Sequence, residues 1–162
     1  MVYAIIMFAI LALDQITKIY VSAQGASWEV TVIPGVFSFI YGKNRGAAFS
    51  SLANADWAQT FFAVLTFIIL PVLFVVFLRL KKGNKWLKTS LILIIAGTIG
   101  NFIDRLVFKE VTDFIYVHFF ANFNVADISL TVGAIMLVVY FLFLDKDALI
   151  PMGKNRKKKT DG

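Results

Sequence analysis

The sequence contains no cysteine and a single histidine among its 162 residues. The lack of cysteine excludes a disulfide-stabilised fold and a thiolate metal site, and one histidine argues equally against a multi-histidine metal centre. Charged residues are also scarce, at 16% of the chain. A composition this poor in charge excludes an intrinsically disordered protein, which combines high charge with low hydrophobicity.

Apolar residues are abundant instead. They make up 59% of the chain, and the mean hydropathy is +0.80. Soluble proteins average about 45–50% apolar residues. A chain of this length has too little interior to bury the excess, so the surplus must face lipid. We therefore predict an integral membrane protein.

Four apolar runs are long enough to cross a bilayer as helices, which takes about 20 residues each. The first run lacks the basic start and the small-residue cleavage site of a secretory signal peptide, so we expect it to remain as a span. All four belong to one integral-membrane domain covering residues 1–162. The predicted spans are residues 2–21, 57–78, 87–103 and 126–144.

The distribution of lysine and arginine predicts that both termini face the cytoplasm. Eleven of the 16 basic residues lie in the connection after the second span or in the tail, residues 145–162. Short connections rich in basic residues stay on the cytoplasmic side. The connections 22–56 and 104–127 then face outward. We assign the basic tail to orientation and to contact with anionic membrane lipids, and we predict no nucleic-acid partner.

The first outer connection predicts a small β element over residues 28–49. Its β-branched and aromatic runs, 28–33 and 36–41, are separated by Pro34 and Gly35, which is typical of two strands joined by a turn. The predicted fold class is therefore an all-α membrane protein with four transmembrane helices and a small outward-facing β element at the membrane surface.

Ionisable residues concentrate at the outward ends of the first, third and fourth spans. Such residues are costly in a membrane, and the default interpretation is functional. Asp14 and Lys18 are four positions apart and share a helix face, so they are either a self-neutralising pair or part of a site. The third span carries a small and polar stripe that we expect to face the other helices. The stripe consists of Gly97, Gly100, Asn101 and Asp104.

Two further aspartates offer a catalytic set. Asp113 lies in the second outer connection, and Asp127 opens the fourth span, where Asn124 has the spacing of a helix cap. The fourteen positions between the aspartates exclude their meeting on one helix, so the chain must fold back to unite them. Two carboxyls in one desolvated site share a proton. The ionised one can activate water while the protonated one stabilises the developing tetrahedral species, which suffices for peptide hydrolysis.

Five short motifs in this order resemble the lipoprotein signal peptidase (signal peptidase II) family. The resemblance implies a bacterial inner-membrane aspartic endopeptidase with four spans and an outward-facing site. Such an enzyme removes the signal peptide of a prolipoprotein on the amino side of a diacylglyceryl-modified cysteine. The motifs are Asp14-Gln-Ile-Thr-Lys18, Asn44-Arg-Gly-Ala-Ala-Phe49, Gly100-Asn-Phe-Ile-Asp-Arg105, Val111-Thr-Asp-Phe-Ile115 and Phe123-Asn-Val-Ala-Asp127.

The resemblance implies that Asp113 and Asp127 are the catalytic dyad, with no metal and no cofactor. The strand pair would correspond to the family's small sheet, which lies on the membrane and cradles substrate. Thr112 stands where the family more usually has valine, and the stretch between the two aspartates is shorter than usual. We expect a monomer whose partners are the diacylglyceryl-modified prolipoprotein and membrane lipids. Residues expected to support or line the site are Asp14, Lys18, Asn44, Gly46, Asn101, Asp104, Arg105 and Asn124.

Three other interpretations compete with this one. Intramembrane acids also relay protons in small proton-coupled transporters, although these place their charges near the midplane and show internal repeats. Lys18 and Ser22 lie one helical turn apart and could form a serine–lysine dyad if the lysine were desolvated. A purely structural assembly subunit would explain the apolar content but not the acids. We interpret His118 as an interface residue.

Overall fold

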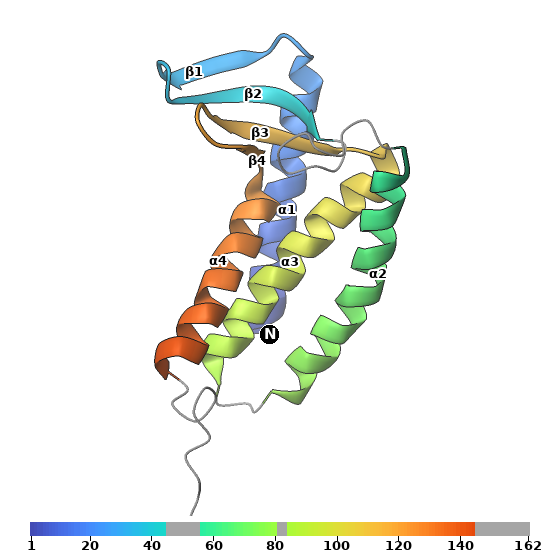
Figure 1. The fold of residues 1–162 in the computed structure, drawn as a ribbon, viewed down its shortest axis with the longest axis vertical. Coiled ribbons are helices and arrows are strands. Elements are labelled where there is room, and N and C mark those ends of the chain that lie inside the picture. The colour runs from blue at the N-terminus through green and yellow to red at the C-terminus, as the bar shows by residue number, and fades with distance from the viewer. Residues whose placement is uncertain (45–55, 81–83, 145–162) are drawn as a thin grey trace, which may run out of the picture.

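The computed structural model describes residues 1–44, 56–80 and 84–144, which form four long helices and one small sheet (Figure 1). The helices are α1 (Val2–Gln24), α2 (Asp56–Arg79), α3 (Lys85–Phe108) and α4 (Val125–Val139), and a π-helical turn over Tyr140–Leu144 continues α4. The strands are β1 (Glu29–Ile33), β2 (Phe37–Asn44), β3 (Val111–Val117) and β4 (Asn122–Phe123). The predicted fold class is confirmed.

Four helical segments are long and apolar enough to cross a bilayer: Val2–Gln24, Gln59–Arg79, Lys85–Phe108 and Val125–Leu144. The third extends five residues beyond its predicted end at Ile103, so Asp104 and Arg105 lie within the helix instead of the following loop. The helix continues because the next residues are apolar and Asp104 is neutralised by an ion pair. It ends at Lys109, which adopts a left-handed conformation with φ 60°.

Helix α3 occupies the centre of the bundle and contacts α1, α2 and α4 (Figure 1). Its predicted stripe is buried at all four positions, which confirms that the stripe faces the other helices. Glycine is required where α3 and α4 cross, because a methyl group at Gly133 would lie 2.7 Å from the backbone oxygen of Ser90. Small residues allow such close helix contacts in membranes. The close approach brings the polar end of α3 against the start of α4.

Helix α2 is the most exposed of the four helices, and its described apolar side chains are either exposed or half-buried. None of the residues in its most apolar window is buried, and its mean hydropathy there is 3.0. A helix that is apolar on every side and exposed in the structure is a helix that faces lipid. Pro71 lies inside this helix. Membrane helices tolerate an internal proline where neighbouring groups compensate for the backbone hydrogen bond that proline cannot form.

The sheet lies at one end of the bundle, opposite the N-terminus and the end of α4 (Figure 1). Its antiparallel order is β1-β2-β3-β4. The predicted turn at Pro34 and Gly35 is present, with the Val36 N–H donating to the Ile33 oxygen at 3.0 Å and Gly35 at φ 71°. Of the predicted β element, residues 45–49 lie outside the described residues.

Two strands were not predicted. Strand β3, read from the sequence as part of a loop, pairs with β2 so that Gly42 faces Asp113 and Asn44 faces Val111. This pairing joins segments that are separated in the chain by α2 and α3, so it depends on the tertiary fold. The consequence is functional, since this register carries Asp113 to the top of α3 and α4.

Candidate active site

Asp113 lies in the middle of β3 with only 2% of its surface exposed. Its carboxylate accepts two hydrogen bonds from side-chain amides, one from Asn44 Nδ2 at 2.9 Å and one from Asn124 Nδ2 at 2.8 Å. The β2–β3 pairing explains the first contact, because Asn44 ends β2 beside the start of β3. A buried carboxyl is therefore held by two amides in a fixed orientation.

Asp127 occupies the first turn of α4 and takes part in a reciprocal cap. The Asn124 side chain accepts from the Asp127 N–H at 2.9 Å, and Asp127 Oδ2 accepts from the Asn124 N–H at 3.2 Å. The cap expected at Asn124 is therefore present. Asp127 Oδ1 also accepts from Asn101 Nδ2 at 2.7 Å. Residues from α3 and from the start of α4 thus fix the second carboxyl.

Asn124 joins the two aspartates. Its side-chain amide donates to Asp113 and its backbone N–H donates to Asp127, while the residue itself is completely buried. The convergence of the two acids, which requires the chain to fold back between them, is thus achieved by the β3–β4 hairpin leading into α4. A carboxyl on β3 and a carboxyl on α4 are thus linked by hydrogen bonds to one asparagine.

Burial, together with the nearby charge of Asp127, raises the pKa of the Asp113 carboxyl from 3.8 to about 7. The hydrogen bonds from Asn44 and Asn124 and the charge of Lys18 oppose the rise. A carboxyl with this pKa keeps its proton at neutral pH in a large share of molecules. The site therefore combines a proton donor at Asp113 with a second carboxyl close by.

Beneath the dyad lies a buried ionic cluster. Lys18 Nζ contacts Asp14 Oδ2 at 2.9 Å and Asp104 Oδ2 at 3.1 Å, and all three side chains are at most 4% exposed. Asp14 Oδ1 accepts from the backbone N–H of Ala126 at 2.8 Å, and Asp104 Oδ2 accepts from that of Thr112 at 3.2 Å. The two acids thus hold the start of α4 and the start of β3 in place.

The same cluster argues against the serine–lysine alternative. Lys18 Nζ is held by the carboxylates of Asp14 and Asp104 and by the amide oxygen of Asn101. The Ser22 hydroxyl lies 3.4 Å from the Thr112 hydroxyl. That contact uses the hydroxyl at the position where the family more usually has valine. Ser22 and Lys18 therefore serve the packing of α1 against β3 and α3.

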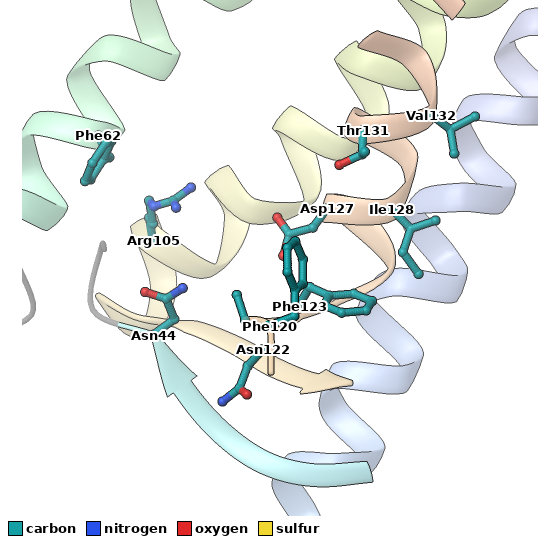
Figure 2. A pocket seen from close by; sticks show the side chains of 11 residues that line it. Asn44, Phe62, Arg105, Phe120, Asn122, Phe123, Asp127, Ile128, Thr131 and Val132 are labelled. Carbon is teal, nitrogen blue, oxygen red and sulfur yellow. The ribbon is translucent and has the colours of Figure 1, made fainter. Parts of the chain in front are cut away.

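A cleft of about 570 Å³ opens beside Asp127 between α2, α3 and α4. Figure 2 shows Arg105 between Phe62 on one side and Asp127 on the other. The guanidinium lies 5.6 Å from the centre of the Phe62 ring, and its Nε atom is buried without a hydrogen-bond partner among the described residues. Further lining residues are Asn44, Phe120, Ala121, Asn122, Phe123, Ile128, Thr131 and Val132. The cleft thus offers one carboxylate and one guanidinium within an apolar wall.

A separate apolar groove lies along α2 and α3. Its volume is about 450 Å³ and every lining residue is apolar. On α3 its lining runs from Phe102, three positions before Arg105, to Ile95. This stretch of helix spans about 10 Å, about a third of a bilayer core of about 30 Å.

The structure places seven of the eight expected supporting residues in one network of polar contacts around Asp113 and Asp127. The eighth, Gly46, lies outside the described residues. Sequence reasoning missed Gln15, whose side chain donates to Asp14 Oδ2 and to Asp104 Oδ1, both at 3.1 Å. The signal was available, because Gln15 stands within the Asp14 to Lys18 motif. Sequence reasoning also missed the aromatic side chains that line the cleft, because each lies among other apolar residues and carries no separate signal. These are Phe62, Phe120 and Phe123.

The described residues contain no cluster of three or more histidine, cysteine or acidic side chains arranged to hold a metal ion. The chemistry that the described arrangement can perform is acid–base chemistry on a water molecule. Two carboxyls in one poorly hydrated site, with a neighbouring guanidinium, supply a base, an acid and a group that binds a carbonyl oxygen.

Comparison with known proteins gives a consistent result. The model of the family described as signal peptidase (SPase) II matches residues 6–143. The lipoprotein signal peptidase of Pseudomonas paraeruginosa (strain DSM 24068 / PA7) is 41% identical over 137 residues, covering 80% of this chain and 81% of that protein. The lipoprotein signal peptidase of Listeria monocytogenes serovar 1/2a (strain ATCC BAA-679 / EGD-e) is 38% identical over 150 residues, covering 90% and 95%.

Solved structures agree with the fold. One, described as a bacterial membrane enzyme at 2.3 Å resolution, superposes with a TM-score of 0.80 at 32% identity and covers 99% of this chain and 94% of its own. A second bacterial membrane enzyme, solved at 1.9 Å resolution, gives a TM-score of 0.77 at 33% identity over 88% and 93% of the two chains.

Proposed function

The chain belongs to the signal peptidase II family, and from this premise we propose that Asp113 and Asp127 are the catalytic dyad of a lipoprotein-processing aspartic endopeptidase. The observation that carries the proposal is the bridge through Asn124, which ties two carboxyls from separate elements at the edge of the cleft. The family establishes a peptidase, and the dyad supplies a way for it to hydrolyse a peptide bond.

In the proposed mechanism Asp127 acts as the base. It lines the cleft and takes a proton from a water molecule as that water attacks the scissile carbonyl carbon. Protonated Asp113 donates a hydrogen bond to the carbonyl oxygen as negative charge develops there. The tetrahedral species then collapses, the C–N bond breaks, and the amine of the leaving residue receives the proton held by Asp127. Asp113 keeps its own proton, so the dyad returns to its starting state.

Arg105 is proposed to bind the substrate backbone. Its buried Nε–H has no partner among the described residues, and Arg105 lines the same cleft as Asp127. A buried donor without an acceptor is costly, and a carbonyl oxygen of an extended peptide would satisfy it. This contact would hold the peptide beside the dyad, as expected for a supporting residue.

The substrate is proposed to be a prolipoprotein with a diacylglyceryl-modified cysteine, cut on the amino side of that cysteine. Acyl chains stay in the outer leaflet, which places the neighbouring peptide bond at the depth of the dyad. The wholly apolar groove along α2 and α3 lies a few positions from Arg105 along α3 and would accept part of an acyl chain. The lipid would set the depth at which the peptide is cut.

We further propose a multi-pass protein of the bacterial cytoplasmic membrane with both termini in the cytoplasm and the sheet outside. The distribution of basic residues supports this orientation, and the sheet and dyad lie together at the end of the bundle away from the N-terminus (Figure 1). Family membership leaves the proton-coupled transporter without a supporting observation. The chain is proposed to act as a monomer.

The experiment that tests the function uses the purified protein in detergent or liposomes with two synthetic substrates. One carries a signal peptide and a diacylglyceryl-modified cysteine, and the other has the same peptide without the lipid. We expect cleavage of the lipidated peptide on the amino side of the cysteine, measured by mass spectrometry. Equal cleavage of both peptides would remove the lipid from the proposal, and cleavage of neither would refute the activity.

A further inference from the structure

Lys18 makes one contact that its ion pairs do not require. Its Nζ lies between Asp14 and Asp104, which already neutralise its charge, yet it also donates to Asn101 Oδ1 at 3.0 Å. The lysine side chain is 4% exposed, so water does not compete for this hydrogen bond. The contact links the ionic cluster to a residue that touches the dyad.

We propose that Lys18 is a positioning residue that fixes the orientation of the Asn101 amide and so keeps Asp127 as the proton acceptor of the dyad. The inference rests on the proposed function and deepens it, because it assigns the two aspartates different roles. The contacts that carry it join Lys18 on α1, Asn101 on α3 and Asp127 on α4.

The orientation follows from the chemistry of the donors. An ammonium group donates hydrogen bonds and accepts none, so the amide atom that faces Lys18 must be the oxygen. Asn124 Nδ2 donates to the same oxygen at 3.1 Å, which gives it a second donor. With both donors on Oδ1, the Asn101 NH₂ group must point the opposite way, where it donates to Asp127 at 2.7 Å.

This orientation matters for Asp127. Its two oxygens accept from Asn101 Nδ2 and from the Asn124 N–H, and donors on both oxygens favour the ionised carboxylate. A reversed Asn101 amide would present an oxygen to Asp127, and that contact is favourable only if Asp127 carries a proton. The base would then be lost. Charged groups acting on Asp127 from the surrounding elements are Lys18 on α1, Arg105 on α3 and Asp113 on β3.

The test is a double-mutant cycle read from the pH dependence of kcat/KM on the lipidated peptide. Lys18→Met should move the acidic limb to higher pH by about one unit or more, the effect of losing one hydrogen bond to a charged group. In the Asn101→Ala background the same change should move the limb clearly less, because only the charge of Lys18 is then lost. Equal shifts in both backgrounds would mean that Lys18 acts by its charge alone, which would overturn the proposal.

Two measures keep the test decisive if Lys18→Met folds poorly. The pH profile of kcat/KM for the charge-balanced variant Lys18→Met/Asp104→Asn is compared with that of Asp104→Asn. The acidic limb should move to higher pH by the same amount as in Lys18→Met alone. Independently, the carboxyl absorbance of Asp127 is followed by infrared spectroscopy in the Asp113→Asn background, where Lys18→Met should leave the carboxyl protonated at a pH at which it is otherwise ionised. No difference in either comparison would overturn the proposal.

The matched control is Gln15→Ala. Gln15 lies on the same helix and bonds Asp14 and Asp104, but no hydrogen bond joins it to Asn101. It should lower the melting temperature without moving the acidic limb. Failure of the proposed function is distinguishable, because it would appear as activity that survives Asp113→Asn or Asp127→Asn, whereas failure of the inference leaves both variants inactive.

Discussion

At the scale of single residues, the orientation of the two carboxyls depends on side-chain amides. Asn44, Asn101 and Asn124 donate the side-chain hydrogen bonds that orient the two carboxyls. Amides stay neutral at every relevant pH, so they can orient a carboxyl without fixing its charge. The sequence indicated Asn101 through the polar stripe and Asn124 through its cap spacing, and Asn44 only through the family resemblance, since asparagine in a loop is ordinarily a turn residue.

The first residue-scale prediction concerns the dyad. Asp113→Asn and Asp127→Asn each keep the size of the side chain and remove its acid–base function, so each should lower kcat by at least about 10²–10⁴-fold. Cleavage of the lipidated peptide measures the loss, and circular dichroism in detergent checks the helices. Near-normal turnover in a folded variant would exclude that residue from the dyad.

The pKa of Asp113 predicts how stability depends on pH. Because burial raises this pKa from 3.8 to about 7, the folded state favours the protonated carboxyl. The resulting contribution to stability is complete below pH 3.8, shrinks as the pH rises through this range, and is lost above about pH 7. Melting temperatures between pH 5 and pH 8 should fall more steeply for the wild type than for Asp113→Asn. Parallel curves would contradict the assignment.

The protonation of Asp113 also predicts how kcat/KM depends on pH in the alkaline range. Above about pH 7 Asp113 loses the proton with which it stabilises the carbonyl oxygen, so kcat/KM should decline there. A rate that is constant from pH 6 to pH 9 would show that neither member of the dyad needs to be protonated. The measurement uses the lipidated peptide over that pH range.

At the scale of elements, the helices were predictable and strands β3 and β4 were not. The four apolar runs identify the helices because each is long and uncharged for most of its length. The third helix was predicted too short, since Asp104 and Arg105 read as the end of a span until their partners are known. Strand β3 escaped prediction because its partner, β2, lies beyond α2 and α3 in the chain.

The groove between α2 and α3 provides an element-scale prediction. Ile99→Trp would fill the apolar space beneath the cleft, so KM for the diacylated peptide should rise about tenfold or more, the effect of excluding a few methylene groups from an apolar site. Val72→Trp is the matched control, because Val72 is 59% exposed on α2 and does not line the groove. Equal effects of the two substitutions would refute an acyl chain in this groove.

At the scale of the whole molecule, the absence of cysteine becomes an experimental advantage. Single cysteines can be introduced into a background that reacts with no thiol reagent. Val32→Cys, on the exposed strand β1, should be labelled by a membrane-impermeant maleimide in intact spheroplasts. Lys85→Cys, at the opposite end of the bundle, should be labelled only after permeabilisation. The reverse pattern would invert the proposed orientation.

The contact between Asp14 and the Ala126 N–H joins residues 112 positions apart, near the two ends of the transmembrane domain. Under the proposed mechanism, a chain with three of its four spans inserted lacks Asp127, and its Asp14 lacks the contact that holds the start of α4. The proposed dyad is therefore complete only after the last span has entered the membrane.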